Sequence, residues 1–389
     1  MKHSLAVEAA WLYPRLLDVR DAQEKEVLQL LCVNTLTSQD KLWKRGEQPA
    51  HLLWGITQLP EHDIECEILP YSKHSFLRRA SYHLFGNMDQ QIRLLVMRPK
   101  DSVIYGTSQN TLNVLAFLHS LGLFRAPIVS VIRQPPGNSK SKLAYLLSSR
   151  GTSRLACMSR LIQDYFVSKL KTPEEKAPVL ELGVDLDFFP LEDRRPEFII
   201  SAGKTGRDYN TLCSALTEIK VPTKIFCSAH SAPSVAKISR HIEVIFAHHF
   251  TNVISHKDLI NWYHRAYLIA VPLVKSNNQL GLYSLLDAMA VAKPVVITRN
   301  PCIDIDVEAE GCGLWVNPGD VQGWREAIEY LLTNPKIAME MGMRGRRLCE
   351  EKHNLSHFAS QLAGIFRSVS DAERRGPGSA KWLIDQRSV

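Results

Sequence analysis

Short apolar runs of four to eight residues, each ended by Gly, Pro or Asn, alternate with helix-like patterns along most of the sequence. Runs of this length and spacing predict buried strands joined by crossover helices, the pattern of a parallel sheet. We expect strands at residues 26–34, 64–69, 102–105, 126–132, 154–158, 198–202, 224–228, 242–246, 268–271 and 294–298. We expect helices at residues 47–59, 110–123, 209–219, 259–267, 285–292, 323–332 and 354–369. The predicted fold class is therefore α/β, with doubly wound sheets that bind ligands beyond the carboxyl ends of their strands.

The alternation breaks once, at residues 188–197 (FFPLEDRRPE), where two prolines and five charged residues follow one another. This composition is typical of an interdomain linker. A chain of 389 residues is also long enough for two domains. We therefore expect an N-terminal Rossmann-like domain over residues 1–190, a C-terminal one over residues 191–370, and a tail over residues 371–389. The two domains are expected to face each other across a cleft.

The composition argues against several classes of protein. No run of about 20 apolar residues is present, so no membrane span is expected, and the first residues lack a signal-peptide pattern. The eight cysteines lie singly, and His248-His249 has no partner at metal-ligand spacing, so we expect reduced thiols, no metal and no cofactor. Gly203-Lys204-Thr205 is not a Walker A loop, because Phe198 stands where that motif needs a glycine.

Positive charge is concentrated in one segment. The chain carries a formal net charge of +7, yet residues 72–160 contain 13 Lys and Arg against only Asp89 and Asp101, so the remainder is slightly acidic. Within this segment, residues 73–85 read as an amphipathic helix with basic flanks, which could lie in a membrane interface or, as the alternative, pack its apolar side on its own domain. Such asymmetry favours an anionic partner, either a membrane surface or a phosphate-bearing acceptor. Nucleic acid is not expected, because no recognised binding motif accompanies the charge.

Five stretches, mostly in the second half, share their order and spacing with one enzyme family. They are LELGVDLDFFP at 180–190, SAGKTGRDYNTLCSAL at 201–216, ISHKDLINWYHRAYLIAVPL at 254–273, GLYSLLDAMAVAKPVVIT at 281–298 and GCGLWVNPGDVQGWREAIEYLL at 311–332. Over residues 181–369 the chain resembles the donor domain of family 4 glycosyltransferases, which have the two-domain GT-B fold and retain anomeric configuration. The resemblance implies a glycosyltransferase with a nucleotide-sugar donor.

The resemblance also implies a donor site. A departing diphosphate needs cations and backbone N–H groups, and a ribose diol needs a carboxylate, which can accept two hydrogen bonds. Asp287 is placed for the ribose, although an acid that only complements the helix dipole is the alternative. The implied donor-binding residues are Gly203, Lys204, Arg207, Asn278, Gln279, Gly281, Leu282, Tyr283 and Asp287. Of these, Lys204, Arg207 and Gln279 are implied to act in catalysis.

Three positions depart from the family pattern. Eight residues before Asp287 the family often has a Glu; here Gln279 can hydrogen-bond a sugar hydroxyl but carries no charge. Arg133 stands at the end of a first-domain strand, where the family often has a His. Gly46 follows Arg45 where the family has a Gly-Gly loop. Gly46 and Arg133 are the candidates for contacts with the acceptor or with a phosphate, and Arg133 as a rim charge is the alternative.

Two functions remain open at this level. The first is a cytoplasmic glycosyltransferase, free or peripheral at the inner membrane face, that transfers a sugar to a glycan, a lipid-linked acceptor or a small molecule. The second is a non-catalytic GT-B protein that binds a nucleotide-sugar or a glycosyltransferase partner, as Gln279 and Arg133 suggest. A phosphorylase or epimerase on the same architecture is a weaker alternative. No metal is needed in any of them.

Overall fold

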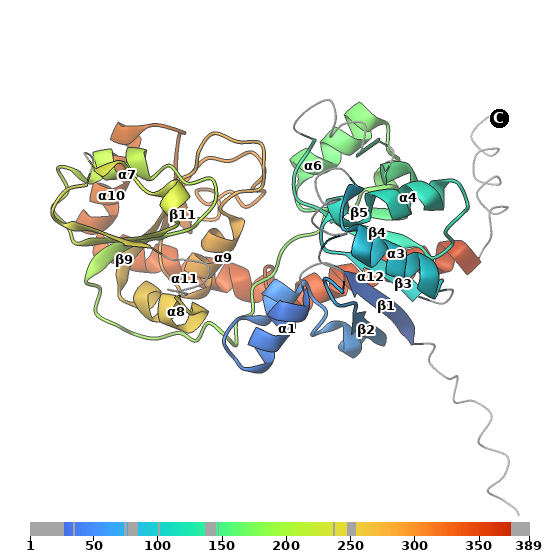
Figure 1. Cartoon of the computed structure of the whole chain (residues 1–389). Coiled ribbons are helices and arrows are strands. Elements are labelled where there is room, and N and C mark those ends of the chain that lie inside the picture. Colours follow the sequence, from blue (N-terminus) through green and yellow to red (C-terminus); the bar gives the residue numbers. More distant parts are fainter. Residues whose placement is uncertain are drawn as a thin grey trace, which may run out of the picture.

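A computed structural model describes residues 27–33, 36–73, 76, 85–99, 102–136, 145–146, 148–235, 238–246 and 254–374. Within these residues the chain forms two β-sheets, which belong to two α/β domains lying side by side (Figure 1). The first sheet has the order β2-β1-β3-β4-β5, and the second has the order β11-β10-β9-β6-β7-β8. Every pairing in both sheets is parallel. The predicted α/β class with two Rossmann-like domains is confirmed.

Ten strands lie within one or two residues of the predicted runs, and β11 was missed. The strands are β1 (Leu28–Val33), β2 (Ile64–Ile68), β3 (Ser102–Gly106), β4 (Ile128–Ile132), β5 (Arg154–Cys157), β6 (Phe198–Ala202), β7 (Thr223–Cys227), β8 (Ile242–Phe246), β9 (Ala266–Val271), β10 (Val295–Thr298) and β11 (Gly313–Val316). All residues of β4 and β6 are buried. Helices therefore cover both faces of each sheet, which explains why these strands read as continuous apolar runs rather than alternating ones.

The helices match the predictions less closely. They are α1 (Leu36–Lys44), α3 (Met88–Met97), α4 (Asn113–Ser120), α6 (Arg160–Asp164), α7 (Tyr209–Leu216), α8 (His256–His264), α9 (Leu282–Ala290), α10 (Val321–Thr333), α11 (Pro335–Glu351) and α12 (Leu355–Arg374). The sequence prediction missed α1, α3, α6 and α11. It also began α8 three residues late, although the Ser255 side chain accepts a hydrogen bond from the Asp258 N–H and caps this helix.

The helix predicted over residues 47–59 is wrong. Two short 3₁₀ helices, η1 (Ala50–Leu53) and η2 (Leu59–His62), occupy this region. Between them Trp54 and Gly55 have φ angles of 55° and 82°. A right-handed helix cannot continue through two left-handed residues, so the segment turns back on itself instead.

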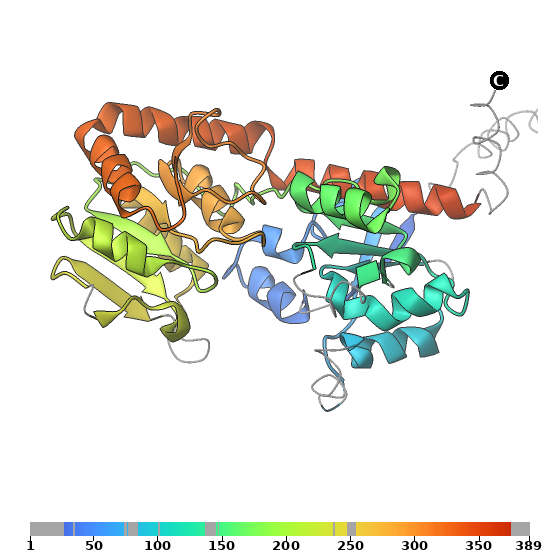
Figure 2. The same ribbon diagram turned by 90° about the horizontal axis from the view of Figure 1, so that it is seen from above.

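The last helix crosses from the second domain to the first. In Figure 2, α12 extends away from α11 and runs along the first domain. The Phe366 ring on α12 meets Tyr105 of β3 edge-on at 5.1 Å, and the Phe358 ring lies 6.5 Å from Trp54. By its packing α12 therefore belongs to the first domain, which differs from the prediction that residues 191–370 form one domain.

The two connections between the domains run side by side. The Val184 N–H donates to the His353 carbonyl at 2.8 Å, and Val184 forms a parallel bridge with Asn354. A Cβ atom on the neighbouring Gly183 would lie 2.0 Å from the Asn354 carbonyl oxygen, so only glycine fits there. This crossing ties the linker to the segment that returns through α12.

None of the helices in the described part of the chain is both apolar enough and long enough to cross a lipid bilayer. Most of the basic amphipathic helix predicted at residues 73–85 lies outside the described residues, as do His248-His249 and the tail beyond residue 374.

Candidate functional site

The carboxyl end of β6 and the start of α9 meet around one partly buried arginine. Arg207 lies on the loop after β6, and its Nη2 donates to the Ser284 hydroxyl in the first turn of α9 at 2.8 Å. Its side chain folds back over Gly203, where a Cβ atom would lie 2.2 Å from Nε. Gly203 is therefore the residue that makes room for the guanidinium.

The charge of Arg207 is not balanced by a nearby acid. Among the residues that the structure describes, no carboxylate oxygen lies within 4.0 Å of its guanidinium. Its Nε is buried and has no hydrogen-bond partner there. Burial lowers the pKa of Arg207, yet a guanidinium stays protonated near neutral pH. A buried cation with an unpartnered donor is costly unless an anion binds it.

The first turn of α9 supplies further donors at the same place. The helix begins at Leu282, directly after Gly281 at a φ of 83°, and no side chain caps its first N–H groups. The first N–H groups of a helix lack intrahelical partners and carry a partial positive charge. Together with Arg207 they form a site suited to a phosphate group. Here Leu282 contributes its backbone, because its side chain is buried in the core.

Replacing Gly281 by alanine is expected to destabilise the folded protein by about 1–3 kcal/mol, because a side chain would be forced into left-handed backbone. The new Cβ atom would also lie 2.9 Å from Cδ1 of Leu273. Gly364→Ala in α12 is the matched control, since a Cβ atom there meets nothing within 4 Å. Urea unfolding of the three proteins measures the difference. Equal stability of Gly281→Ala and wild type would contradict the assigned strain.

Asp287 lies one turn further along α9. It follows Ser284 by three residues and Tyr283 by four, so all three share one face of the helix. Burial raises the pKa of Asp287 from 3.8 to about 7. Burial raises the pKa of the Tyr263 hydroxyl, Asp287 raises it further and Arg207 lowers it, so both charged groups lie near this tyrosine. The predicted ribose acid and the predicted phosphate cation therefore belong to one site.

Lys204 and Arg207 differ in their surroundings, although the sequence prediction grouped them. Lys204 is exposed on the same loop, and the Ser228 hydroxyl donates to its carbonyl at 3.3 Å. Its charge contributes to lowering the pKa of His256 at the start of α8, where burial is the larger cause. Lys204 thus lies toward α8, whereas Arg207 lies against α9.

Aromatic residues of the first domain close the site from the other side. Tyr283 in the first turn of α9 stacks on His51 at 5.8 Å and meets Trp54 edge-on at 6.4 Å. The Arg133 guanidinium lies 5.7 Å from the centre of the Trp54 ring, so Arg133 is at the domain interface as predicted from its strand position. Burial lowers the pKa of His51 to about 3, and its Nδ1 accepts a hydrogen bond from the Asp185 N–H at 3.2 Å. His51 is therefore a neutral ring at neutral pH.

Gln279 connects the two domains. Its Nε2 donates to the Met158 carbonyl at 2.6 Å, and its N–H donates to the Arg133 carbonyl at 3.4 Å. Asn278 is exposed, and its carbonyl accepts a hydrogen bond from the Asn300 side chain at 3.0 Å. One N–H of the Gln279 amide is thus engaged, which leaves the second N–H and the amide oxygen for a ligand.

Gly46 lies apart from this cluster. It has a φ of 66°, and a Cβ built there would lie 3.7 Å from Nζ of Lys257 in α8. The loop therefore approaches the second domain at α8. His51 and Trp54, which do contact α9, escaped the sequence prediction because they lie in a segment mistaken for a regular helix.

The prediction that the protein uses no metal ion is not tested by the structure. Over the described ranges, no group of three or more His, Cys, Asp or Glu side chains is arranged to hold a metal ion. The eight cysteines are free thiols, and seven of them are buried. Whether the protein works without a metal stays a prediction.

Comparison with known proteins finds similarities within the second domain. Residues 234–348 match the family model for glycosyl transferases group 1. A D-inositol 3-phosphate glycosyltransferase of Saccharomonospora viridis is 30% identical over 118 residues, which are 30% of this chain and 26% of that protein. One of Corynebacterium urealyticum is 28% identical over 121 residues, 31% of this chain and 28% of that protein. The chain thus matches about a quarter of the length of these relatives.

Solved structures share the fold over most of the chain. Sucrose-phosphate synthase of Thermosynechococcus elongatus has a TM-score of 0.65 at 13% identity, covering 89% of this chain and 100% of that one. A glycosyltransferase of Rickettsia africae ESF-5 has a TM-score of 0.61 at 15% identity, covering 88% of this chain and 98% of that one. Anabaena HepE, solved in complex with UDP, has a TM-score of 0.61 at 14% identity, covering 88% of this chain and 100% of that one. The chain therefore has the GT-B fold, and over residues 234–348 its C-terminal domain resembles the glycosyl transferases group 1, as its motifs predicted.

Proposed function

We propose that this protein is a glycosyltransferase that moves a sugar from a nucleotide-sugar to an acceptor hydroxyl. The observation that carries the proposal is Arg207, a partly buried guanidinium whose buried Nε has no partner and which has no carboxylate partner among the described residues, set against the uncapped start of α9. Such a pair binds a diphosphate and stabilises the negative charge that grows on it as the sugar leaves. The family match and the UDP and UDP-glucose complexes of Anabaena HepE support the same class of ligand.

In the proposed reaction one bond forms and one bond breaks at the anomeric carbon. The acceptor hydroxyl oxygen attacks the anomeric carbon. The bond between that carbon and the β-phosphate oxygen breaks, and its electron pair leaves with the nucleoside diphosphate. The hydroxyl proton passes to the departing phosphate oxygen. Attack and departure on the same face retain the anomeric configuration, as the family resemblance implies. Arg207 and the N–H groups of α9 stabilise the leaving group, Lys204 adds charge at the rim, and Asp287 accepts from the ribose hydroxyls.

Donor turnover tests this proposal. The protein is incubated with UDP-glucose, UDP-galactose, GDP-mannose and ADP-glucose, and the release of nucleoside diphosphate is measured with and without a mixture of simple glycoside acceptors. We expect release from one class of donor, faster with a suitable acceptor. Binding of a nucleoside diphosphate with no release from any of these donors would contradict the enzymatic function.

One contact favours the non-catalytic alternative. The Gln279 side chain donates to the Met158 carbonyl across the domain interface, so the residue that would face the donor sugar also serves as an interdomain contact. A GT-B protein that only binds a nucleotide-sugar would give the same nucleotide affinity but no turnover. The release assay therefore separates the two functions directly.

We also propose that the protein attaches to the cytoplasmic side of a membrane, where its acceptor would be located. The ends of two helices in the first domain support this proposal. The neighbouring helices α3 and α4 end in exposed apolar and basic residues. Val96 and Leu123 are 77% and 70% exposed, and exposed Arg98 and Arg125 follow closely in the sequence. Apolar side chains can enter the interface of a bilayer while each nearby cation adds about 1 kcal/mol with anionic lipid.

Vesicle flotation tests the membrane surface. With liposomes containing anionic lipid at low salt, we expect wild type to float and the double variant Val96→Glu plus Leu123→Glu to stay in the soluble fraction. High salt should weaken binding of wild type, because it screens the charges. Val235→Glu, at an 85% exposed position of the second domain, is the control. Wild type that fails to float at low salt would rule out the membrane surface and favour a soluble acceptor.

A further inference from the structure

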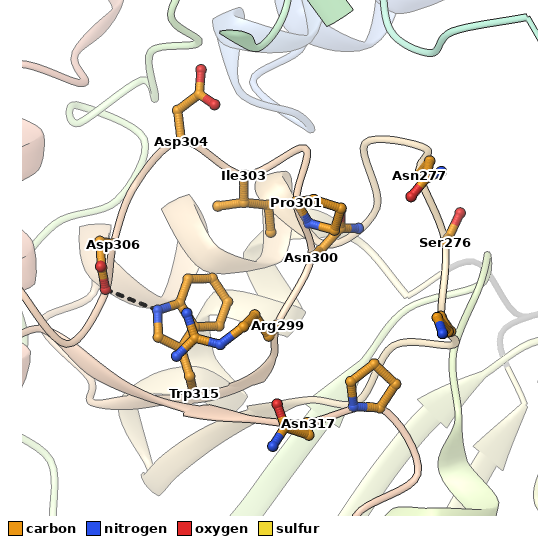
Figure 3. Close-up of a pocket in the computed structure, with 12 residues that line it drawn as sticks. Ser276, Asn277, Arg299, Asn300, Pro301, Ile303, Asp304, Asp306, Trp315 and Asn317 are labelled. Atoms are coloured by element: carbon orange, nitrogen blue, oxygen red, sulfur yellow. Dashed lines mark hydrogen bonds between the residues drawn. The ribbon is translucent and has the colours of Figure 1, made fainter. Parts of the chain in front are cut away.

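A separate pocket lies in the second domain, outside the cluster around Arg207. It has a volume of about 410 Å³ and is formed by the loops that follow β9, β10 and β11 (Figure 3). Small-molecule pockets have volumes of about 300–1,000 Å³, so this one is large enough for a ligand. The donor reaction proposed above uses none of its residues.

One wall of the pocket is a fixed tryptophan. The Trp315 indole N–H donates to the Asp306 carboxylate at 2.9 Å, the hydrogen bond that Figure 3 shows as a dashed line. Its backbone N–H donates to Glu308 at 3.1 Å, and the Arg299 guanidinium lies 5.2 Å from the ring centre. The side chain is nevertheless only partly buried. Contacts that hold an aromatic ring in one orientation at a surface prepare it for a ligand, because no ordering is needed on binding.

The other walls define the chemistry of the ligand. Two cations, Lys275 and Arg299, are balanced by two carboxylates, Asp304 and Asp306, so the pocket has no excess charge to attract a phosphate. Amide groups such as Asn317 add hydrogen-bond donors and acceptors beside the apolar indole. Apolar surface with convergent polar groups and no net charge suits a neutral ligand rich in hydroxyls. A sugar ring has these properties.

The position of the pocket links it to the reaction. The loop at residues 273–281 borders the pocket with Lys275 and then leads to the start of α9. On another side, the Asp304 carboxylate accepts a hydrogen bond from the Arg160 N–H of α6 in the first domain at 2.8 Å. The pocket therefore lies where the two domains meet, next to the segment that begins the phosphate site.

We propose that this pocket binds a neutral saccharide unit of the acceptor, away from the hydroxyl that reacts. The proposal rests on the proposed glycosyltransferase function and adds to it the chemical class of the acceptor. Trp315 would stack on the sugar ring, and the surrounding amide and charged groups would hydrogen-bond its hydroxyls.

Saturation-transfer NMR tests the pocket without catalysis. The probes are the methyl glycosides of glucose, galactose, mannose and N-acetylglucosamine and their β-linked disaccharides. We expect at least one probe to bind wild type and to bind Trp315→Ala about tenfold more weakly, the scale for truncating a central aromatic contact. Asn317→Trp, at an exposed position, fills the pocket without removing the core contacts of Trp315 and is expected to weaken the same probe. Tyr330→Ala, a 43% exposed aromatic of α10, is the control and should bind like wild type.

Two results would overturn the saccharide pocket: no probe binds wild type, or both pocket variants bind it as tightly as Tyr330→Ala does. Calorimetry with UDP and GDP on the same proteins distinguishes failure of the saccharide pocket from failure of the proposed function. Both pocket variants should keep wild-type nucleotide affinity. Loss of nucleotide binding in wild type would contradict the proposed function, whereas loss of glycoside binding alone would contradict only the pocket.

Discussion

Arg207→Ala is expected to lower kcat for donor turnover by about 10²–10³-fold, the cost of removing one group that stabilises charge in a transition state. The side chain lies partly buried between the β6 loop and α9, donates to Ser284, and has one buried N–H without a partner among the described residues. Its interaction with the leaving diphosphate strengthens as charge develops there, so kcat should fall more than KM rises. Steady-state kinetics with the donor that wild type uses measures the effect.

Two further variants make this prediction specific. Lys204→Ala removes an exposed cation from the same loop and is expected to have a smaller effect, because water screens an exposed charge. Arg207→Lys keeps the charge but loses the forked donor geometry, so it should restore only part of kcat. Unfolding curves show whether Arg207→Ala remains folded. A folded Arg207→Ala protein with wild-type kcat would move the phosphate site elsewhere.

Asp287→Asn is expected to make the unliganded protein more stable and to weaken nucleotide binding. The raised pKa, about 7 against 3.8, means that folding disfavours the ionised carboxylate. At about 1.4 kcal/mol per pKa unit the cost at pH 8 is at most about 4–5 kcal/mol. The cost grows as the pH rises from 4 to 7 and is absent below pH 4, where the carboxyl is protonated in both folded and unfolded states. Asparagine avoids the cost but cannot accept two hydrogen bonds from a ribose diol.

Urea unfolding at pH 5 and pH 8 measures the first effect, and calorimetry with a nucleoside diphosphate measures the second. The stability gained by Asp287→Asn should be largest at pH 8 and clearly smaller at pH 5. Wild-type affinity should rise between pH 6 and pH 8 more steeply than that of the variant, which corrects for titration of the phosphate itself near pH 6. Parallel pH profiles of affinity would show that Asp287 does not contact the ligand.

Both sheets could be predicted from the sequence because parallel strands covered on two faces are continuous apolar runs. β4 and β6, buried along their whole length, were therefore recognised within two residues. The short helices were harder, since a helix such as α1 has one buried residue and shows almost no apolar stripe. The packing of α12 could not be predicted, because the periodicity of an amphipathic helix does not reveal which domain covers its apolar side.

The sequence could predict which residues lie around the start of α9, but not how each of them is placed there. The motif around Gly281 and Asp287 identified the right helix, yet burial separates Arg207 from Lys204, and burial depends on the distant Ser284. The contacts of Tyr283 with His51 and Trp54 join residues more than 200 positions apart, so no local pattern contains them. The hydrogen bond from Gln279 to Met158 is equally non-local.

The central claim is that Arg207 and the first turn of α9 form a diphosphate site. Calorimetric titration of wild type and Arg207→Ala with a nucleoside, its monophosphate and its diphosphate tests it most directly. The claim predicts that the diphosphate binds wild type far more tightly than the monophosphate and the nucleoside, and that Arg207→Ala loses most of this difference while keeping its affinity for the nucleoside. Equal affinities of the three ligands for wild type, or the same gain from the diphosphate in both proteins, would contradict it.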